Sequence, residues 1–458
     1  MSTFDRFMIA GAHKSSGKTV VSTGLAGALR RAGAVVQTFK KGPDYIDPMW
    51  LARASGRACY NLDFNTMGRD EITARLTSAA LPGGVSLVEA NKGLYDGVAV
   101  DGSDSNAEMA KHLGLPVILV IDTVGMTRGI APLLVGYQAF DPDVTIGGLI
   151  LNKVGGARHE GKLRRAIETY CDIPVLGSVW RDGRLGIGER HLGLIPPPEI
   201  EHNDALIDKI IDIVGGSVDL DAIRAVAASA PTLTPVEPPR AVPSGKVQGL
   251  RIGVIRDAAF GFYYPDDLEA FQAAGADLVF IDAINDTELP ALDGLFIGGG
   301  FPECLMEALS ANTAMRRALR DALSNGLPCY AECGGMMYLC DSLSWNGETR
   351  PMVGLIAGRA VMHAKPQGRG HVVYRNVRDH PWGCPLEAAK AHEFHYASIE
   401  DLPADTRFAR TMERGQGIDG TQDGIVVANT LAGFCHMRDA ATTPWVEKFL
   451  EFVAGCAR

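Results

Sequence analysis

The sequence lacks a long apolar run, a basic cluster and any pair of cysteines with Cys-x-x-Cys spacing. Because no apolar run is long enough to cross a bilayer, and the first residues lead directly into a predicted strand, we expect a soluble cytoplasmic protein. The formal net charge of -10 argues against a nucleic-acid partner. The nine cysteines are odd in number and scattered, which indicates neither a disulfide framework nor a structural zinc site.

The length of 458 residues is more than one hydrophobic core ordinarily serves, so about two or three domains are expected. The composition changes between Pro231 and Pro243, where five prolines are separated by small and polar residues. A segment of this kind predicts an extended linker. We therefore expect an N-terminal domain at 1–227, a linker at 228–249 and a C-terminal domain at 250–458.

In the N-terminal half, apolar runs alternate with helical patterns, which is typical of a mostly parallel, doubly wound α/β sheet. The predicted strands lie at 7–10, 34–39, 85–88, 116–121, 145–151 and 173–176. The alternation resumes after the linker, with predicted strands at 252–255, 278–281, 292–297 and 327–331. Both halves are therefore expected to be α/β.

The stretch after the first predicted strand is typical of a phosphate-binding loop. It ends in Gly17-Lys18-Thr19 and a helical pattern follows, although Ala12 stands where the usual loop has glycine. In such loops backbone N–H groups cradle phosphates, the lysine reaches the terminal phosphates and the hydroxyl binds magnesium. Asn152 follows a later strand and is placed like a reader of the nucleotide base. The residues that we predict to bind ATP are Gly11, Lys14, Ser16, Gly17, Lys18, Thr19 and Asn152.

Acidic residues follow the second and third predicted strands. Asp44, Tyr45 and Asp47 come after Gly42-Pro43 and before Pro48, and the prolines predict a rigid loop there instead of a helix. Such a loop lies at the carboxyl edge of the sheet, where ligands bind in α/β folds, although an Asp in a loop often only forms a turn. Glu89, at the tip of a strand beside the phosphate loop, is placed to hold Mg²⁺.

In the C-terminal half, a predicted strand ending at Ala331 turns at Cys333 into a helical pattern that continues through Leu343. Gly334 and Gly335 permit the tight backbone of a nucleophile elbow. There the first N–H groups of the helix can lower the thiol pKa and hold an oxyanion. The alternative is that Cys333 is an ordinary buried cysteine.

A thiolate that performs acyl chemistry needs a histidine partner and an oxyanion site. Gly300, in a run of three glycines at a strand end, can bring a backbone N–H close to a ligand. His392 and His395 are three residues apart on no evident helix, so they lack the spacing of a zinc protease motif. The histidines available in this half are His363, His371, His380, His392, His395 and His436.

Taken together, the chain resembles the glutamine-dependent cobyrinic or hydrogenobyrinic acid a,c-diamide synthases of cobalamin biosynthesis. The N-terminal half is similar to the dethiobiotin synthetase type of phosphate-loop fold and the C-terminal half to class I glutamine amidotransferases. The strings that carry the resemblance are Gly11–Thr19, Gly42–Pro48, Gly93–Gly97, Arg190–Leu194, Gly298–Glu303, Tyr330–Gly335 and His392–Tyr396.

The resemblance implies a coupled reaction. Cys333, activated by His436, would release ammonia from glutamine while the N–H groups of Gly300 and Gly334 stabilise the oxyanion. Lys18, Thr19 and Mg²⁺ would present ATP to a tetrapyrrole carboxylate, and ammonia would attack the resulting acyl phosphate. The resemblance also assigns substrate contacts to Asp44, Tyr45 and Asp96, and magnesium to Thr19, Asp47 and Glu89.

Some positions depart from the family pattern. Arg438 stands two residues after His436, where the usual amidotransferases carry the glutamate of a Cys-His-Glu triad, so a dyad is expected. Asn91-Lys92 replaces small or apolar residues near the substrate positions, and the ending Phe434–Arg438 differs from that common in corrinoid enzymes. These differences leave open the sirohaem amidases, which share the architecture and act on another tetrapyrrole.

Two further classes remain open at this point. One is a non-catalytic phosphate-loop ATPase with a degenerate amidotransferase domain, and the other is a metallohydrolase that uses His392 and His395. We expect a small-molecule tetrapyrrole as the substrate, and a homodimer is compatible with the sequence.

Overall fold

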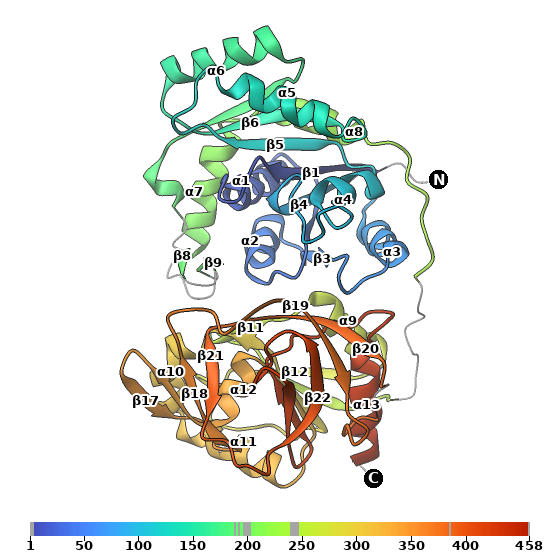
Figure 1. The fold of residues 1–458 in the computed structure, drawn as a ribbon, viewed down its shortest axis with the longest axis vertical. Coiled ribbons are helices and arrows are strands. Elements are labelled where there is room, and N and C mark those ends of the chain that lie inside the picture. The colour runs from blue at the N-terminus through green and yellow to red at the C-terminus, as the bar shows by residue number, and fades with distance from the viewer. Residues whose placement is uncertain are drawn as a thin grey trace. The chain divides into compact units, whose positions relative to one another are not determined.

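The computed structural model describes residues 4–186, 189–190, 193–195, 203–238, 247–383 and 386–456. The chain divides into two compact units, Met1–Pro239 and Arg240–Arg458 (Figure 1). The linker predicted at 228–249 includes residues outside the described ranges, and the predicted domain boundaries stay predictions. No helix in the part of the chain that the structure describes is long and apolar enough to span a bilayer.

The N-terminal unit contains a seven-stranded sheet in the order β3-β2-β4-β1-β5-β6-β7. Every neighbouring pair is parallel, so the predicted doubly wound sheet is confirmed. The strands of this unit are β1 (Asp5–Gly11), β2 (Val36–Lys41), β3 (Tyr60–Leu62), β4 (Val85–Gly93), β5 (Val117–Asp122), β6 (Ile146–Val154), β7 (Val175–Trp180), β8 (Glu189–Arg190) and β9 (Gly193–Leu194). Its helices are α1 (Lys18–Arg31), α2 (Ile46–Ser55), α3 (Arg69–Ala79), α4 (Asn106–Leu113), α5 (Ile130–Phe140), α6 (Ala157–Tyr170), η1 (Gly183–Leu185), α7 (Asn203–Gly215) and α8 (Leu220–Ala228).

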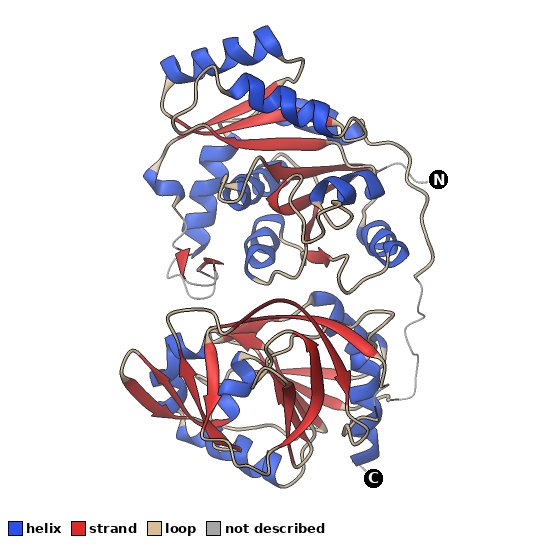
Figure 2. Cartoon of the chain, viewed as in Figure 1, coloured by secondary structure: helices blue, strands red, loops and turns tan. Residues whose placement is uncertain are grey.

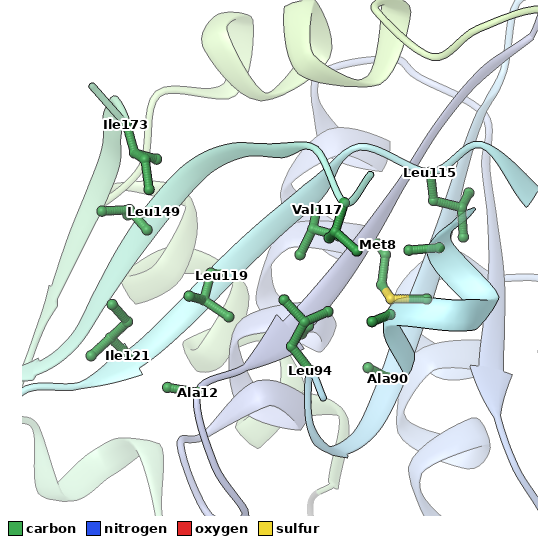
Figure 3. Close-up of a cluster of buried hydrophobic side chains, with 14 of the residues drawn as sticks. Met8, Ala12, Ala90, Leu94, Leu115, Val117, Leu119, Ile121, Leu149 and Ile173 are labelled. Atoms are coloured by element: carbon green, nitrogen blue, oxygen red, sulfur yellow. The ribbon is translucent and has the colours of Figure 1, made fainter. Parts of the chain in front are cut away.

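Helices cover the sheet on both faces. Met8 and Leu119 lie on one face in a buried apolar cluster with Val117 and Leu149 (Figure 3). Residues of α3, α4, α5 and α6 belong to the same cluster. On the other face α1 packs against α2 and α7. A Cβ on Gly24 or Gly27 of α1 would overlap Val214 or Ile211 of α7, so these glycines allow the two helices to approach closely.

The C-terminal unit contains a nine-stranded sheet in the order β12-β10-β13-β15-β24-β23-β22-β19-β20. Figure 2 shows the helices and strands of both units in separate colours. Its strands pair in parallel from β12 to β24 and antiparallel from β24 to β20. A four-stranded sheet has the order β17-β16-β18-β21. The strands are β10 (Arg251–Ile255), β11 (Phe260–Phe262), β12 (Asp277–Ile281), β13 (Gly294–Ile297), β14 (Gly299–Gly300), β15 (Cys329–Glu332), β16 (Cys340–Trp345), β17 (Glu348–Pro351), β18 (Ile356–Met362), β19 (Gly368–Asn376), β20 (Ala388–His395), β21 (Ala397–Glu400), β22 (Arg407–Arg414), β23 (Gln422–Val427) and β24 (Thr430–Gly433). The helices are α9 (Pro265–Ala273), η3 (Pro302–Leu305), α10 (Met306–Ala311), α11 (Thr313–Ser324), α12 (Gly334–Leu339) and α13 (Trp445–Cys456).

One predicted loop is a helix in the structure. The expectation that prolines exclude a helix around Asp47 is wrong, because α2 begins at Ile46 and contains both Asp47 and Pro48. Pro48 lies in the first turn, where the backbone N–H groups have no partner within the helix, so the missing N–H of proline costs little. Asp44 caps this start, since its Oδ1 accepts hydrogen bonds from Ile46 N and Asp47 N at 3.0 and 3.1 Å.

The helix expected after Cys333 is shorter than predicted. It ends at Leu339, and Cys340–Trp345 forms β16 instead, which pairs with β17 and β18. Pairing with strands further along the chain therefore outweighs the local helical pattern.

Candidate active sites

The phosphate loop joins β1 to α1 and is braced by its own side chains and by β6. Ser16 Oγ donates a hydrogen bond to the carbonyl oxygen of His13 at 2.7 Å. Asn152 Nδ2 donates to the carbonyl oxygen of Ser16 at 2.9 Å. Gly17 has φ 84°, and a Cβ there would overlap the Asn152 amide. The side chain of Asn152 therefore lies against the loop backbone, and its role in reading a base stays a prediction.

The lysine of the loop is buried in the N-terminal unit. Burial, followed by the nearby charge of Lys40, lowers the pKa of Lys18 to about 8. An amine with this pKa is still mostly protonated at neutral pH, as a phosphate ligand should be. Gly11 ends β1 directly before the loop, and Lys14 is exposed within it.

The three predicted magnesium ligands lie together around a lysine that the sequence reasoning did not single out. Thr19 Oγ1 donates to Glu89 Oε1 at 3.0 Å. Lys40 Nζ donates to Glu89 Oε1 at 2.6 Å and to Asp47 Oδ2 at 2.5 Å. Burial favours the neutral amine of Lys40, but Asp47 and Glu89 outweigh it and hold its pKa well above the ordinary value. The sequence signal that could have indicated Lys40 is a lysine within a run of strand-forming residues. The structure shows that this lysine is buried.

This cluster fits a Mg²⁺ ion that is shared with nucleotide phosphates. Glu89 is fully buried and its Oε2 has no hydrogen-bond partner, so one carboxylate oxygen is left for a cation. Mg²⁺ usually takes one or two protein carboxylates and completes its shell with water and phosphate oxygens. In the described residues, no group of three or more His, Cys, Asp or Glu side chains could hold a metal by itself. Thr19, Asp47 and Glu89 are therefore the residues that would hold it.

The predicted substrate residues lie near this cluster. Asp44 Oδ2 is 4.0 Å from Lys40 Nζ, and burial followed by the charge of Asp47 raises the pKa of Asp44 to about 7. Tyr45 is buried just before α2. Asp96 is exposed, and its Oδ2 accepts a hydrogen bond from Gly93 N at 2.9 Å at the end of β4.

In the C-terminal unit, the nucleophile elbow has the strained backbone that the sequence predicts. Cys333 follows the parallel strand β15 and has φ 45° and ψ -102°, a conformation that non-glycine residues rarely adopt. A Cβ on Gly335 would overlap the carbonyl oxygen of Ile297, so this turn excludes any side chain at position 335. Cys333 is 7% exposed, between β13 and β24.

The two predicted oxyanion residues are neighbours. A Cβ on Gly334 would lie 3.0 Å from the backbone nitrogen of Gly300. A Cβ on Gly300 would overlap the carbonyl oxygen of Ala259 on the other side. A side chain at Gly334 would therefore crowd the Gly300 segment, and a side chain at Gly300 would crowd Ala259 behind it.

His436 is the histidine that the structure brings to Cys333. It is buried, it interacts with Cys333, and its Nδ1 lies 3.3 Å from Glu332 Oε2. Burial favours the neutral imidazole, but the interactions with Cys333 and Glu332 outweigh it and raise the pKa of His436 to about 10. The ring therefore carries a proton at neutral pH.

Two family models match the chain, one to each unit. The CobQ/CobB/MinD/ParA nucleotide binding domain matches residues 7–193, and the CobB/CobQ-like glutamine amidotransferase domain matches residues 251–441. A cobyrinate a,c-diamide synthase of Magnetococcus marinus is 41% identical over 451 residues, which cover 98% of this chain and 97% of that protein. The chain belongs to the cobyrinate a,c-diamide synthase family.

Other relatives with the same name agree. Those of Methanosarcina acetivorans and Archaeoglobus fulgidus are 38% and 39% identical, and the alignments cover 95% and 97% of this chain and 93% and 97% of theirs. The predicted family, fold class and enzyme class, a glutamine-dependent amidating ligase, are confirmed. Among solved structures, a glutamine amidotransferase matches with 14% identity, covers 44% of this chain and 98% of that chain and has a TM-score of 0.32, too low to add to the argument.

The departure of Arg438 from the usual amidotransferase pattern has a structural explanation. Arg438 is buried, and its guanidinium donates to Asp266 Oδ2 at 2.6 Å and lies over the ring of Tyr264. The carboxylate that lies beside His436 is instead that of Glu332, the residue directly before Cys333. Sequence reasoning missed Glu332, and its signal was an acidic residue at the end of an otherwise apolar strand.

The remaining histidines have other partners. The rings of His392 and His436 are stacked with centroids 4.9 Å apart, and burial lowers the pKa of His392 well below its ordinary value. His395 Nδ1 bonds to the carbonyl oxygen of Ala397 at 2.8 Å, and its ring stacks on Phe434. Neither contact resembles a metal site, so this geometry does not favour the metallohydrolase alternative.

Proposed function

We propose that the chain amidates the a and c carboxylates of cobyrinic or hydrogenobyrinic acid, with ATP as the activating agent and glutamine as the nitrogen donor. The observation that carries the proposal is the strained elbow that places Cys333 against His436, in a chain whose full length matches cobyrinate a,c-diamide synthases. An intact nucleophile and its base support catalysis and argue against a degenerate amidotransferase domain.

The glutaminase half-reaction would use Cys333, His436 and the two glycines. Cys333 Sγ attacks the side-chain amide carbon of glutamine and forms a C–S bond, while the N–H groups of Gly300 and Gly334 stabilise the oxyanion. The C–N bond then breaks, and the imidazolium of His436 gives its proton to the leaving ammonia. Water, deprotonated by the now neutral His436, attacks the thioester and releases glutamate and the thiol.

The synthetase half-reaction would take place at the phosphate loop. A substrate carboxylate oxygen attacks the terminal phosphorus of ATP, ADP leaves, and ammonia displaces phosphate from the acyl phosphate to give the amide. Lys18 holds the terminal phosphates, and Asp44, Tyr45 and Asp96 contact the substrate. When bound by Thr19, Asp47 and Glu89, Mg²⁺ neutralises phosphate charge. A carboxylate needs this activation because it is a poor acyl donor.

The substrate is tested by mass spectrometry of reactions that contain enzyme, ATP, Mg²⁺ and glutamine with cobyrinic acid, hydrogenobyrinic acid or sirohaem. Two carboxylate-to-amide conversions on a corrinoid are expected. Conversion of sirohaem alone would contradict the assignment of a corrinoid as the substrate. The proposed ATP- and glutamine-dependent amidation would still hold. The second candidate, sirohaem amidase, rests on Lys92, an exposed cation at the end of β4 with φ 42°, which departs from the small or apolar residue expected there for a corrinoid enzyme.

The partner predictions follow from this proposal. The small-molecule partner is a tetrapyrrole, and the cytoplasmic location, the absence of nucleic-acid and membrane partners and a homodimer stay predictions.

A further inference from the structure

Glu332 is held in one position beside the imidazole of His436. It ends the buried strand β15 and is itself buried. Its Oε1 accepts hydrogen bonds from Tyr330 Oη at 2.7 Å and from Met437 N at 2.8 Å. With Oε1 fixed by two donors, Oε2 faces His436 Nδ1 at 3.3 Å. A carboxylate held in this way can orient an imidazole and keep a proton on Nδ1.

His436 is also fixed from its other sides. Its backbone N–H donates to the carbonyl oxygen of His392 at 2.8 Å, and the two rings are stacked at an interplanar angle of 15°. Its Cε1 lies 2.7 Å from where a Cβ on Gly299 would be. With Nδ1 directed to Glu332, Nε2 is the nitrogen that remains for Cys333.

We propose that Glu332 is the third member of the nucleophile system, a positioning residue that acts on Cys333 through His436. The proposal rests on the glutaminase function proposed for Cys333 and His436. In this chain the carboxylate comes from the residue before the nucleophile, because the position two residues after the histidine is Arg438, which is paired with Asp266. The system would therefore be a triad, where the sequence pattern alone predicts a dyad.

Other ionisable groups surround the system and must be considered in any pH profile. Arg438 and His371 act on His392, and Arg410 acts on Tyr330. Tyr263, Asp267 and Tyr330 interact with Glu332, and His392 interacts with His436. Asp266 and Asp439 act on Asp267. Glu332 itself lies 3.3 Å from His436 Nδ1, so a change at Glu332 is expected to alter the proton on the imidazole.

The Glu332→Gln variant tests the proposal. Its amide oxygen can still accept from Tyr330 and Met437, but its NH₂ group faces Nδ1 and makes that nitrogen an acceptor. The proton then sits on Nε2, which can no longer accept a proton from the Cys333 thiol. We expect the kcat for glutamine hydrolysis to fall by about 10²- to 10⁴-fold at neutral pH, with a much smaller change in KM.

The decisive readout is the rate of Cys333 alkylation by iodoacetamide as a function of pH, measured on the Cys333 peptide by mass spectrometry. From about pH 6 to about pH 8 the wild type is expected to react faster than Glu332→Gln, because only in the wild type does Nε2 accept the proton of the Cys333 thiol. This readout needs neither ATP nor the tetrapyrrole. A faster wild-type rate without turnover of glutamine would therefore reject the proposed function and leave the triad standing.

The matched control is Glu400→Gln, which makes the same carboxylate-to-amide change at a surface residue of the same unit that pairs with Arg359 at 2.9 Å. Its alkylation profile is expected to match the wild type. If circular dichroism shows that Glu332→Gln does not fold, Glu332→Asp replaces it as the test variant. The shorter side chain keeps the negative charge but holds it further from His436. We therefore expect Glu332→Asp to have a lower kcat than the wild type. Wild-type kcat and an unchanged alkylation profile in a folded Glu332 variant would overturn the proposal.

Discussion

At the scale of single residues, the chemistry depends on pairs that lie far apart in the sequence. Cys333 meets His436, and Lys40 meets Glu89. Motif spacing predicted the cysteine, the phosphate loop and the acid at the strand tip. It could not predict Lys40 or Glu332 as parts of the sites, because their partners lie on other elements and meet them only after the sheets form.

Replacing the nucleophile should separate the two half-reactions. In Cys333→Ser, glutamine-driven amidation and glutamine hydrolysis are expected to fall to background, because the serine hydroxyl is not ionised by His436. Amidation driven by added ammonia should remain at the wild-type rate, since it needs only the phosphate-loop site. Product amide is measured by mass spectrometry with each nitrogen source. Loss of the ammonia-driven reaction would contradict the separation of roles.

The raised pKa of His436 predicts how Cys333 reacts with an alkylating agent. With a pKa of about 10, the imidazole is protonated throughout the neutral range and places a positive charge beside Cys333. Removing this cation in His436→Gln should slow the alkylation of Cys333 at pH 7 by at least about 10-fold, because a neighbouring positive charge favours ionisation of a thiol.

The control for this experiment is His363→Gln. His363 Nε2 contacts Ser398 Oγ at 2.7 Å, away from the elbow, so the alkylation rate of Cys333 should not change. An unchanged rate in His436→Gln would show that the thiolate does not depend on this histidine.

The magnesium site predicts a loss of nucleotide binding when one carboxylate is neutralised. In Glu89→Gln the buried oxygen that is left for a cation loses its charge, so MgATP affinity measured by calorimetry should fall by at least about 10-fold. Glutamine hydrolysis should continue. Glu108, which is 23% exposed and pairs with Arg69 at 2.9 Å, provides a control as Glu108→Gln. Equal MgATP affinity in Glu89→Gln and the wild type would remove Glu89 from the ligand set.

At the scale of elements, the sequence predicts structure best where local pattern and tertiary pairing agree. The long apolar strands of the N-terminal sheet were predicted within a few residues, whereas β3, at Tyr60–Leu62, is too short for its pattern to be visible. The helical segment from α10 to α11 is divided at Asn312, whose side chain accepts a hydrogen bond from Met315 N and caps α11. A cap that starts a new helix within a continuous helical pattern is hard to see before the fold is known.

The turn at the nucleophile makes an element-scale prediction about stability. A Cβ on Gly335 would overlap the backbone oxygen of Ile297, which cannot move without shifting β13, so Gly335→Ala should lower the free energy of unfolding by about 3 kcal/mol. Gly455, in α13 of the same unit, has no atom within 4 Å of such a Cβ. Gly455→Ala should therefore be neutral or stabilising by up to about 1 kcal/mol. Urea unfolding followed by circular dichroism compares the two, and equal midpoints would show that the elbow tolerates a side chain.

At the scale of the whole molecule, the proposal requires that ammonia made in one unit reach the acyl phosphate held by the other. Free ammonia is mostly protonated at neutral pH, so release into water would waste most of it. We therefore expect the nitrogen to pass without equilibrating with the solvent. The test uses glutamine labelled with ¹⁵N at the side-chain amide in the presence of excess unlabelled ammonium. Retention of ¹⁵N in the product amide at a pH high enough to make free ammonia abundant supports protected transfer. Dilution of the label in proportion to the added ammonium would mean that Cys333 and the phosphate loop communicate only through bulk solvent.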